Sequence, residues 1–172
     1  MNDHAAKIVA IEMCPARFGF VVFDGPVALI DWGVRNFSSR EVLREKISAL
    51  VTLHAPTRIL IRCRHSASEE ARARTRVAAV VVREEMRRQQ VDMENVGTKE
   101  VSYFFLSRHQ CQTKHQIATK IADWFVELSS KLPAERKKWQ SEPYAIAVFD
   151  AAATAITYFA REYRGVSEET RS

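Results

Sequence analysis

The sequence has no long hydrophobic run and few cysteines. No apolar stretch in its 172 residues approaches the ~20 residues that a membrane-spanning helix needs. The first residues also carry no long apolar segment before a small-residue cleavage site. Cys14, Cys63 and Cys111 are odd in number and widely spaced, which indicates reduced thiols rather than a disulfide framework or a zinc knuckle. These absences predict a cytoplasmic protein that has no membrane association.

The chain also lacks an internal repeat, a low-complexity segment and histidines at metal-ligand spacing. Its composition is that of an ordinary globular protein, with 47% apolar and 27% charged residues. The length suits a single domain with a sizeable core over residues 1–172, with a tail from Gly165 that is expected to fray. A net charge of +5 and a pI near 9.3 are compatible with a polyanionic partner but do not require one.

Apolar runs predict five strands, at residues 6–13, 17–24, 27–35, 57–63 and 91–96. The first three are nearly contiguous and suit antiparallel pairing. The last two are separated by a helix, which implies a parallel crossover. The sequence therefore predicts an α/β protein with a five-stranded mixed sheet, three antiparallel strands followed by two parallel ones, flanked by helices.

Polar residues that can accept hydrogen bonds from free backbone N–H groups mark the helix starts. The pairs that fit a capping box are Ser38 with Glu41, Ser66 with Glu69, and Thr113 with Gln116. The second pair is expected to open a long helix that ends at about Gln89. Ser141 is expected to precede the final helix, with Pro143 in its first turn.

The first predicted strand ends on an acid. From Ile11 to Gly19 the sequence reads IEMCPARFG, so the strand delivers Glu12 at its tip, and two more strands follow on short turns. This pattern resembles the start of the ribonuclease-H-like fold and, within it, the RuvC-type Holliday junction resolvases, whose first strand reads I-D-P-G-x-x-x-x-G. The closing glycine matches, whereas the acid is Glu rather than Asp and the first glycine is absent.

The resemblance implies a site in which acids bind two Mg²⁺ or Mn²⁺ ions. The family places one acid on the first strand, one at the end of the fourth strand and two at i, i+3 on one face of the last helix. Glu12 and Asp150 match two of these positions, so they are the candidate catalytic and metal-binding residues. Arg62 stands at the fourth-strand position and Ala153 at that of the last acid. If the alignment shifts by three residues, Ala147 is the missing acid instead.

Arg62 would oppose metal binding. At an effective dielectric near 20, a unit charge about 6 Å from a divalent ion costs on the order of 5 kcal/mol. Arg62 could instead pair with Glu12 and Asp150 and replace the charge of the metal, or hold a phosphate directly. Glu69 and Glu70 are alternative sources of acids from the following loop.

Two further segments resemble the family. Residues 112–117, QTKHQI, look like its A-D-K-E-Q-V segment, and Thr98 to Val101 resemble its S-P-R-E-V segment. The first match aligns Lys114 with a basic residue close to the scissile phosphate. Lys114 is therefore a candidate for both catalysis and nucleic-acid binding.

Other basic and aromatic residues are candidates for nucleic-acid binding. Trp139, within KKWQ, could stack on an unpaired base. Four arginines of the predicted long helix fall within about 60° of one helical face: Arg72, Arg76, Arg83 and Arg87. This stripe is either a solvated face or a surface for phosphate or for a partner.

The same helix, residues 69–89, carries more apolar surface than a one-sided surface helix needs. Its additional apolar residues are Val77, Val80, Val81 and Met86. The resemblance implies a symmetric homodimer that forms through this helix, with Val77 to Met86 as candidate contacts.

Three functions remain open from the sequence. The first is a divergent Mg²⁺- or Mn²⁺-dependent, structure-specific endodeoxyribonuclease that acts on Holliday junctions. The second is a homologue that binds branched or duplex DNA and whose endonuclease activity is weakened or lost. The third is a non-catalytic scaffold or protein-interaction module. The missing acids favour the second over the first, and the basic residues favour both over the third.

Overall fold

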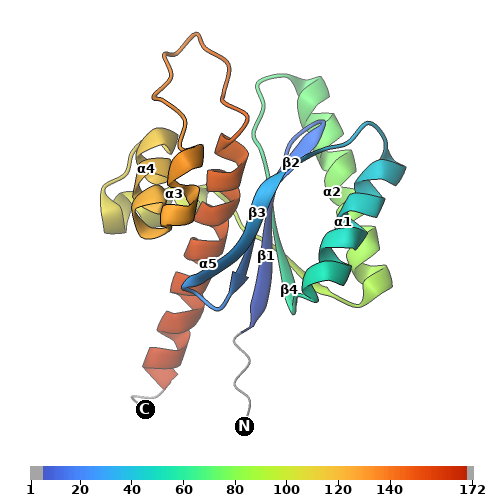
Figure 1. The fold of residues 1–172 in the computed structure, drawn as a ribbon, viewed down its shortest axis with the longest axis horizontal. Helices are drawn as coiled ribbons and strands as arrows, with labels where there is room; N and C mark the ends of the chain where they lie inside the picture. The colour runs from blue at the N-terminus through green and yellow to red at the C-terminus, as the bar shows by residue number, and fades with distance from the viewer. Residues whose placement is uncertain (1–5, 170–172) are drawn as a thin grey trace.

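Five strands form one mixed sheet at the centre of the protein (Figure 1). The structure is a computed structural model that describes residues 6–169. The strands are β1 (Lys7–Met13), β2 (Arg17–Asp24), β3 (Ala28–Asn36), β4 (Arg58–Cys63) and β5 (Asp92–Asn95). They lie in the order β3-β2-β1-β4-β5, with β1, β2 and β3 antiparallel and with β4 parallel to both β1 and β5. The predicted five-stranded mixed sheet is confirmed.

Helices cover both faces of the sheet (Figure 1). They are α1 (Arg40–His54), α2 (Glu69–Gln89), α3 (Thr98–His109), α4 (Lys114–Trp124), the 3₁₀ helix η1 (Val126–Lys131) and α5 (Ile146–Glu169). One face packs against α1 and α2, and the other packs against α3, α4 and α5. Side chains alternate between the faces along β1: Val9 and Ile11 point toward α1 and α2, and Ile8 and Ala10 point toward α5. By this alternation Glu12 lies on the α5 face.

Two predicted helix starts are wrong by one or two residues. The cap of α1 is Ser39, whose hydroxyl accepts from the backbone N–H of Val42 at 3.2 Å, rather than Ser38. The cap of α2 is Ser68 rather than Ser66. The carbonyl oxygen of Ser66 accepts from Arg72 Nη1 at 2.7 Å, which keeps Ser66 in the preceding loop. The capping box predicted at the start of α4 is present.

The predicted start of the last helix at Ser141 is also wrong, because α5 begins at Ile146. Residues 132–145, here called the cover segment, contain no helix or strand and form the loop at the top of Figure 1. Tyr144 donates its hydroxyl hydrogen to Asn36 Oδ1 at 3.0 Å, and this contact holds the end of the segment against β3 instead of in a helical turn. At its other end α5 continues to Glu169, and residues 170–172 of the predicted frayed tail lie outside the described residues. No described helix is long and apolar enough to cross a membrane.

Candidate functional site

Three elements bring the candidate acids together. Glu12 on β1 lies beside Arg62 on β4 in the parallel register and opposite Gly19 on β2 in the antiparallel register. Helix α5 crosses this part of the sheet so closely that a Cβ atom at Gly19 would lie 2.3 Å from the carbonyl oxygen of Ala147. Only glycine allows this approach. Asp150 follows Ala147 by three residues on the same helical face and so reaches the tip of β1.

Arg62 lies between the two carboxylates. Its Nε donates to Glu12 Oε2 at 2.7 Å, and its Nη2 lies 3.2 Å from Asp150 Oδ1. All three residues are buried, with Glu12 1%, Arg62 7% and Asp150 6% exposed. The structure thus brings together the two predicted acids and Arg62, the cation at the fourth-strand position of the family pattern.

Lys114 and two residues that the sequence did not single out extend this cluster. Lys114 donates from Nζ to Asp150 Oδ2 at 3.0 Å and lies 2.8 Å from Glu142 Oε1. The other carboxylate oxygen of Glu142 pairs with Arg64. We call Glu12, Arg62, Asp150, Lys114, Glu142 and Arg64 the charge network. It contains three acids and three cations, so its formal charges cancel.

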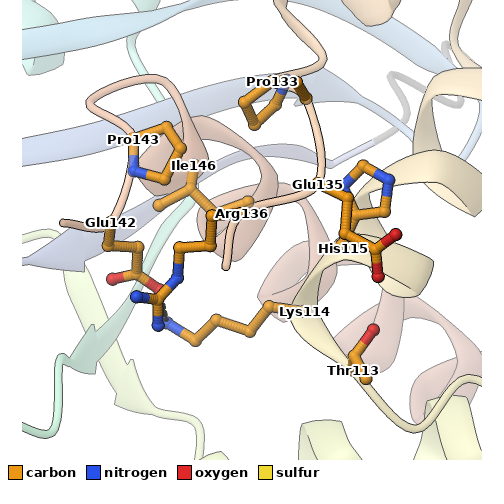
Figure 2. A pocket seen from close by; sticks show the side chains of 10 residues that line it. Thr113, Lys114, His115, Pro133, Glu135, Arg136, Glu142, Pro143 and Ile146 are labelled. Atoms are coloured by element: carbon orange, nitrogen blue, oxygen red, sulfur yellow. Dashed lines mark ion pairs between the residues drawn. The ribbon is translucent and has the colours of Figure 1, made fainter. Parts of the chain in front are cut away.

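Arg64 could have been found from the sequence, but Glu142 could not. The backbone N–H of Arg64 still pairs with the carbonyl of Met13 at 2.8 Å, so the strand alternation continues and points Arg62 and Arg64 to the same side of the sheet. Glu142 lies in the cover segment, which has no helical or strand periodicity from which the direction of its side chains could be predicted. Figure 2 shows Lys114 reaching Glu142 beside a cavity of about 250 Å³.

Burial and the neighbouring charges of opposite sign act in opposite directions on the pKa values of Glu12 and Arg62. Burial raises the pKa of Glu12 to about 7, with a smaller contribution from the negative charge of Asp150, while the nearby Arg62 opposes the rise. Burial also opposes the charge of Arg62, but the carboxylates of Glu12 and Asp150 outweigh it and raise the pKa of the guanidinium. Arg62 therefore remains charged, whereas the pKa of Glu12 lies close to neutral pH.

The residues present do not fit a pair of divalent metal ions. Two carboxylates remain of the four that the family pattern has, and both are bound by Arg62 or Lys114. Ala153, at the position of the last acid, is packed in the apolar core, and Ala147, the alternative, faces Gly19. Within residues 6–169 no group of three or more His, Cys, Asp and Glu side chains is placed to hold a metal ion.

Glu69 and Glu70 do not replace the missing acids. Both lie on the exposed first turn of α2, where Glu69 binds Arg72 and Arg76 and Glu70 binds Arg74. Their carboxylates therefore neutralise their own helix rather than the charge network.

The basic stripe of α2 is divided into two pairs. Arg72 and Arg76 share Glu69 as a partner, at 2.8 Å each. Arg83 and Arg87 are exposed and form no ion pair with the described residues. The first pair also lines a groove of about 400 Å³ at the end of β4, together with Arg64, His65 and Lys99. This groove and the charge network share Arg64, so a basic surface leads away from the network.

Two of the predicted dimer contacts are wrong. Val81 and Met86 are 4% and 1% exposed and belong to the core between the sheet and α1 and α2, because the helical period turns them toward β4. Val77 and Val80 are 40% and 48% exposed, so they remain candidates for dimer contacts. Trp139 is 78% exposed on the cover segment, with Lys137 Nζ 5.1 Å from its ring centre.

No protein-family model and no curated protein sequence matches the chain, but solved structures match its fold. RuvC of Thermus thermophilus in complex with a Holliday junction substrate aligns with a TM-score of 0.68 at 16% identity, over 91% of this chain and 96% of that one. The yeast mitochondrial Holliday junction resolvase Ydc2 aligns with a TM-score of 0.63 at 14% identity, over 96% and 86%. The Fowlpox virus resolvase in complex with Holliday junction DNA gives 0.55 at 8% identity, over 90% and 99%. The RuvC-type resolvase fold predicted from the sequence is therefore confirmed.

Proposed function

We propose that this protein binds branched DNA and that its resolvase-type site has weakened or lost metal-dependent endonuclease activity. The observation that carries the proposal is the position of Arg62, whose guanidinium hydrogen-bonds Glu12 and pairs with Asp150 where the family pattern has a further acid. The fold is that of proteins whose structures contain Holliday junctions.

Electrostatics argue against two-metal chemistry at this place. A metal ion and Arg62 would compete for the same carboxylate oxygens of Glu12 and Asp150. At an effective dielectric near 20, a divalent ion about 6 Å from the guanidinium loses on the order of 5 kcal/mol, which corresponds to more than a thousandfold in affinity. Even a fraction of this energy weakens Mg²⁺ binding tenfold or more.

The surface around the site suits a phosphate backbone. Arg64, His65 and Lys99 line the groove at the end of β4, and the exposed Arg83 and Arg87 follow along α2. Phosphate contacts by such side chains release counterions and give affinity that falls steeply with salt. Trp139, exposed on the cover segment, offers an aromatic face to an unpaired base.

The experiment that tests the proposal compares binding and cleavage of a four-way junction. Wild-type protein is expected to bind the junction and to cleave it weakly or not at all in Mg²⁺; Mn²⁺ is the more permissive assay metal because nitrogen and oxygen ligands bind it more tightly. The control variant Arg62→Glu plus Ala153→Asp restores two acids. It is expected to gain Mg²⁺ affinity in calorimetry first, and activity only if the restored side chains reach the metal.

One result would return the protein to the active resolvases. Robust Mg²⁺-dependent nicking by the wild type, lost on Asp150→Asn, would mean that the remaining carboxylates suffice for catalysis. Absence of binding to both the junction and a duplex would instead remove DNA as the partner.

A further inference from the structure

Glu142 links the cover segment to two cations from different parts of the fold. Its Oε1 lies 2.8 Å from Nζ of Lys114, at the start of α4, and its Oε2 pairs with Arg64, just beyond the end of β4. The side chain of Arg64 is 10% exposed, that of Glu142 20% and that of Lys114 48%. The pair of cations therefore lies at the surface of the charge network, partly covered by Glu142.

A cavity adjoins Glu142 itself, and a separate groove adjoins its partner Arg64. Lys114 and Glu142 line the cavity of about 250 Å³ beneath the cover segment (Figure 2). Arg64 lines the basic groove of about 400 Å³ at the end of β4. The basic groove therefore meets the charge network at Arg64, which Glu142 pairs with.

A carboxylate that bridges two cations resembles a phosphodiester in charge and in acceptors. Both groups carry one negative charge and present two oxygens that accept charge-assisted hydrogen bonds from a guanidinium and an ammonium. Asp150, the other partner of Lys114, is 6% exposed and fixed on α5, whereas Glu142 comes from a segment without regular secondary structure. Of the two acids that contact Lys114, Glu142 is the more exposed and the one that lies outside a helix.

We propose that Lys114 and Arg64 form a binding site for a phosphodiester of DNA, and that Glu142 occupies this site until a backbone phosphate displaces it. The inference rests on the DNA binding proposed above and adds the position of one phosphate and the group that competes for it. Without Glu142, Lys114 keeps only Asp150 as a carboxylate partner and Arg64 keeps no carboxylate partner among the described residues, so the site gains a net positive charge. Glu142 thus lowers DNA affinity in the wild type. When a phosphate displaces it, the cover segment, which includes Trp139, is released from Lys114 and Arg64.

The test is the affinity of Glu142→Gln for a fluorescent four-way junction, measured by anisotropy at about 50 mM and about 200 mM salt. The variant is expected to bind on the order of five- to tenfold tighter than the wild type at the lower salt, because removing one competing charge near two cations is worth about 1 kcal/mol. Glu127→Gln, which removes the same charge from an exposed position on η1, is the matched control and is expected to change affinity by less than about twofold. Adding Arg64→Gln to Glu142→Gln is expected to abolish the gain.

A second measurement follows the cover segment directly. The exposed Arg136, Lys137 and Lys138 are trypsin sites within it, and without DNA they are expected to be cleaved faster in Glu142→Gln than in the wild type. Glu142→Asp keeps the charge but withdraws it by one methylene, so it is expected to give a smaller gain in affinity of the same sign, even if the Gln variant folds poorly.

The outcomes separate this inference from the proposed function. If the wild type binds DNA and neither Glu142 variant binds more tightly than Glu127→Gln, the phosphate site is wrong and DNA binding stands. A gain that survives the loss of Arg64 also contradicts the site, because another cation would then hold the phosphate. If neither the wild type nor Glu142→Gln binds the junction at about 50 mM salt, the proposed function itself fails.

Discussion

Replacing Arg62 by methionine tests whether this side chain neutralises buried acids. Methionine retains the flexible apolar stem and removes the charge. Arg62 is 7% exposed, and its partners Glu12 and Asp150 are 1% and 6% exposed. After the substitution Glu12 loses its ion-pair partner and Asp150 keeps only Lys114. Removing one partner from a buried ion pair costs about 3–5 kcal/mol, so the free energy of unfolding is expected to fall by that amount at pH 8.

The loss should depend on pH in a defined direction. Burial already raises the pKa of Glu12 to about 7 with Arg62 present, and without the attraction of Arg62 this pKa rises further. A carboxyl group whose pKa is higher in the folded than in the unfolded state stabilises the fold at low pH and loses this contribution as pH rises through the folded pKa. Arg62→Met is therefore expected to be least destabilised near pH 5 and most destabilised above pH 8.

Urea unfolding followed by circular dichroism at several pH values measures both effects. Arg74→Met is the matched control, because Arg74 pairs with Glu70 at the surface with 61% of its side chain exposed, and exposed pairs contribute about 1 kcal/mol or less. Adding Glu12→Gln to Arg62→Met removes one uncompensated charge and is expected to restore part of the stability at pH 8. If Arg62→Met costs no more than Arg74→Met and shows no pH dependence, the charges around Arg62 are not coupled as described.

Three further predictions concern pH, DNA and assembly. In the wild type, raising the pKa of Glu12 from 4.5 to about 7 lowers the free energy of unfolding by on the order of 3 kcal/mol between pH 5 and pH 8. Glu12→Gln is expected to remove this decrease in urea titrations. Parallel profiles of unfolding free energy against pH for the variant and the wild type would contradict this. Neutralising Arg83 and Arg87 is expected to lower the salt slope of junction binding by about 2, and neutralising Arg72 and Arg76, which Glu69 binds, is expected to lower it less. Equal effects would mean that the ion pairs with Glu69 do not shield Arg72 and Arg76. Val80→Asp is expected to shift a dimer toward monomer in sedimentation velocity, and an unchanged distribution would remove α2 as the interface.

The sheet could be predicted from the sequence because its strands are apolar runs that end at turns. The acid at the tip of β1 and the arginine at the corresponding place in β4 follow from these runs, and their register in the structure places Glu12 beside Arg62. The exact helix ends were harder to predict, because Ser38 and Ser39 offer equivalent hydroxyls one residue apart. The choice between them depends on which backbone N–H the hydroxyl meets, and that is set by how α1 packs.

Only the most buried residues of the charge network could be predicted from the sequence. Glu12, Arg62 and Asp150 lie on elements with clear periodicity, whereas Glu142 lies in a polar segment whose path depends on contacts with distant residues such as Asn36. On α2, Glu69 offsets part of the positive charge of the predicted arginine stripe. Glu69 lies three and seven residues before the arginines that it binds, and the spacing of three is a recognised pairing distance on a helix.

A metal ion and a guanidinium are two alternative ways to neutralise the buried carboxylates at this position of the fold. Glu12 and Asp150 are both buried, and the negative charge of Asp150 makes ionisation of Glu12 less favourable unless positive charge lies between them. The planar fork of Arg62 supplies that charge and directs separate nitrogens to the two carboxylates, which the single ammonium of lysine would not match. Adding an acid at Ala153 alone would bury a third carboxylate without a counter-charge, so any change toward metal binding has to remove the charge of Arg62 first.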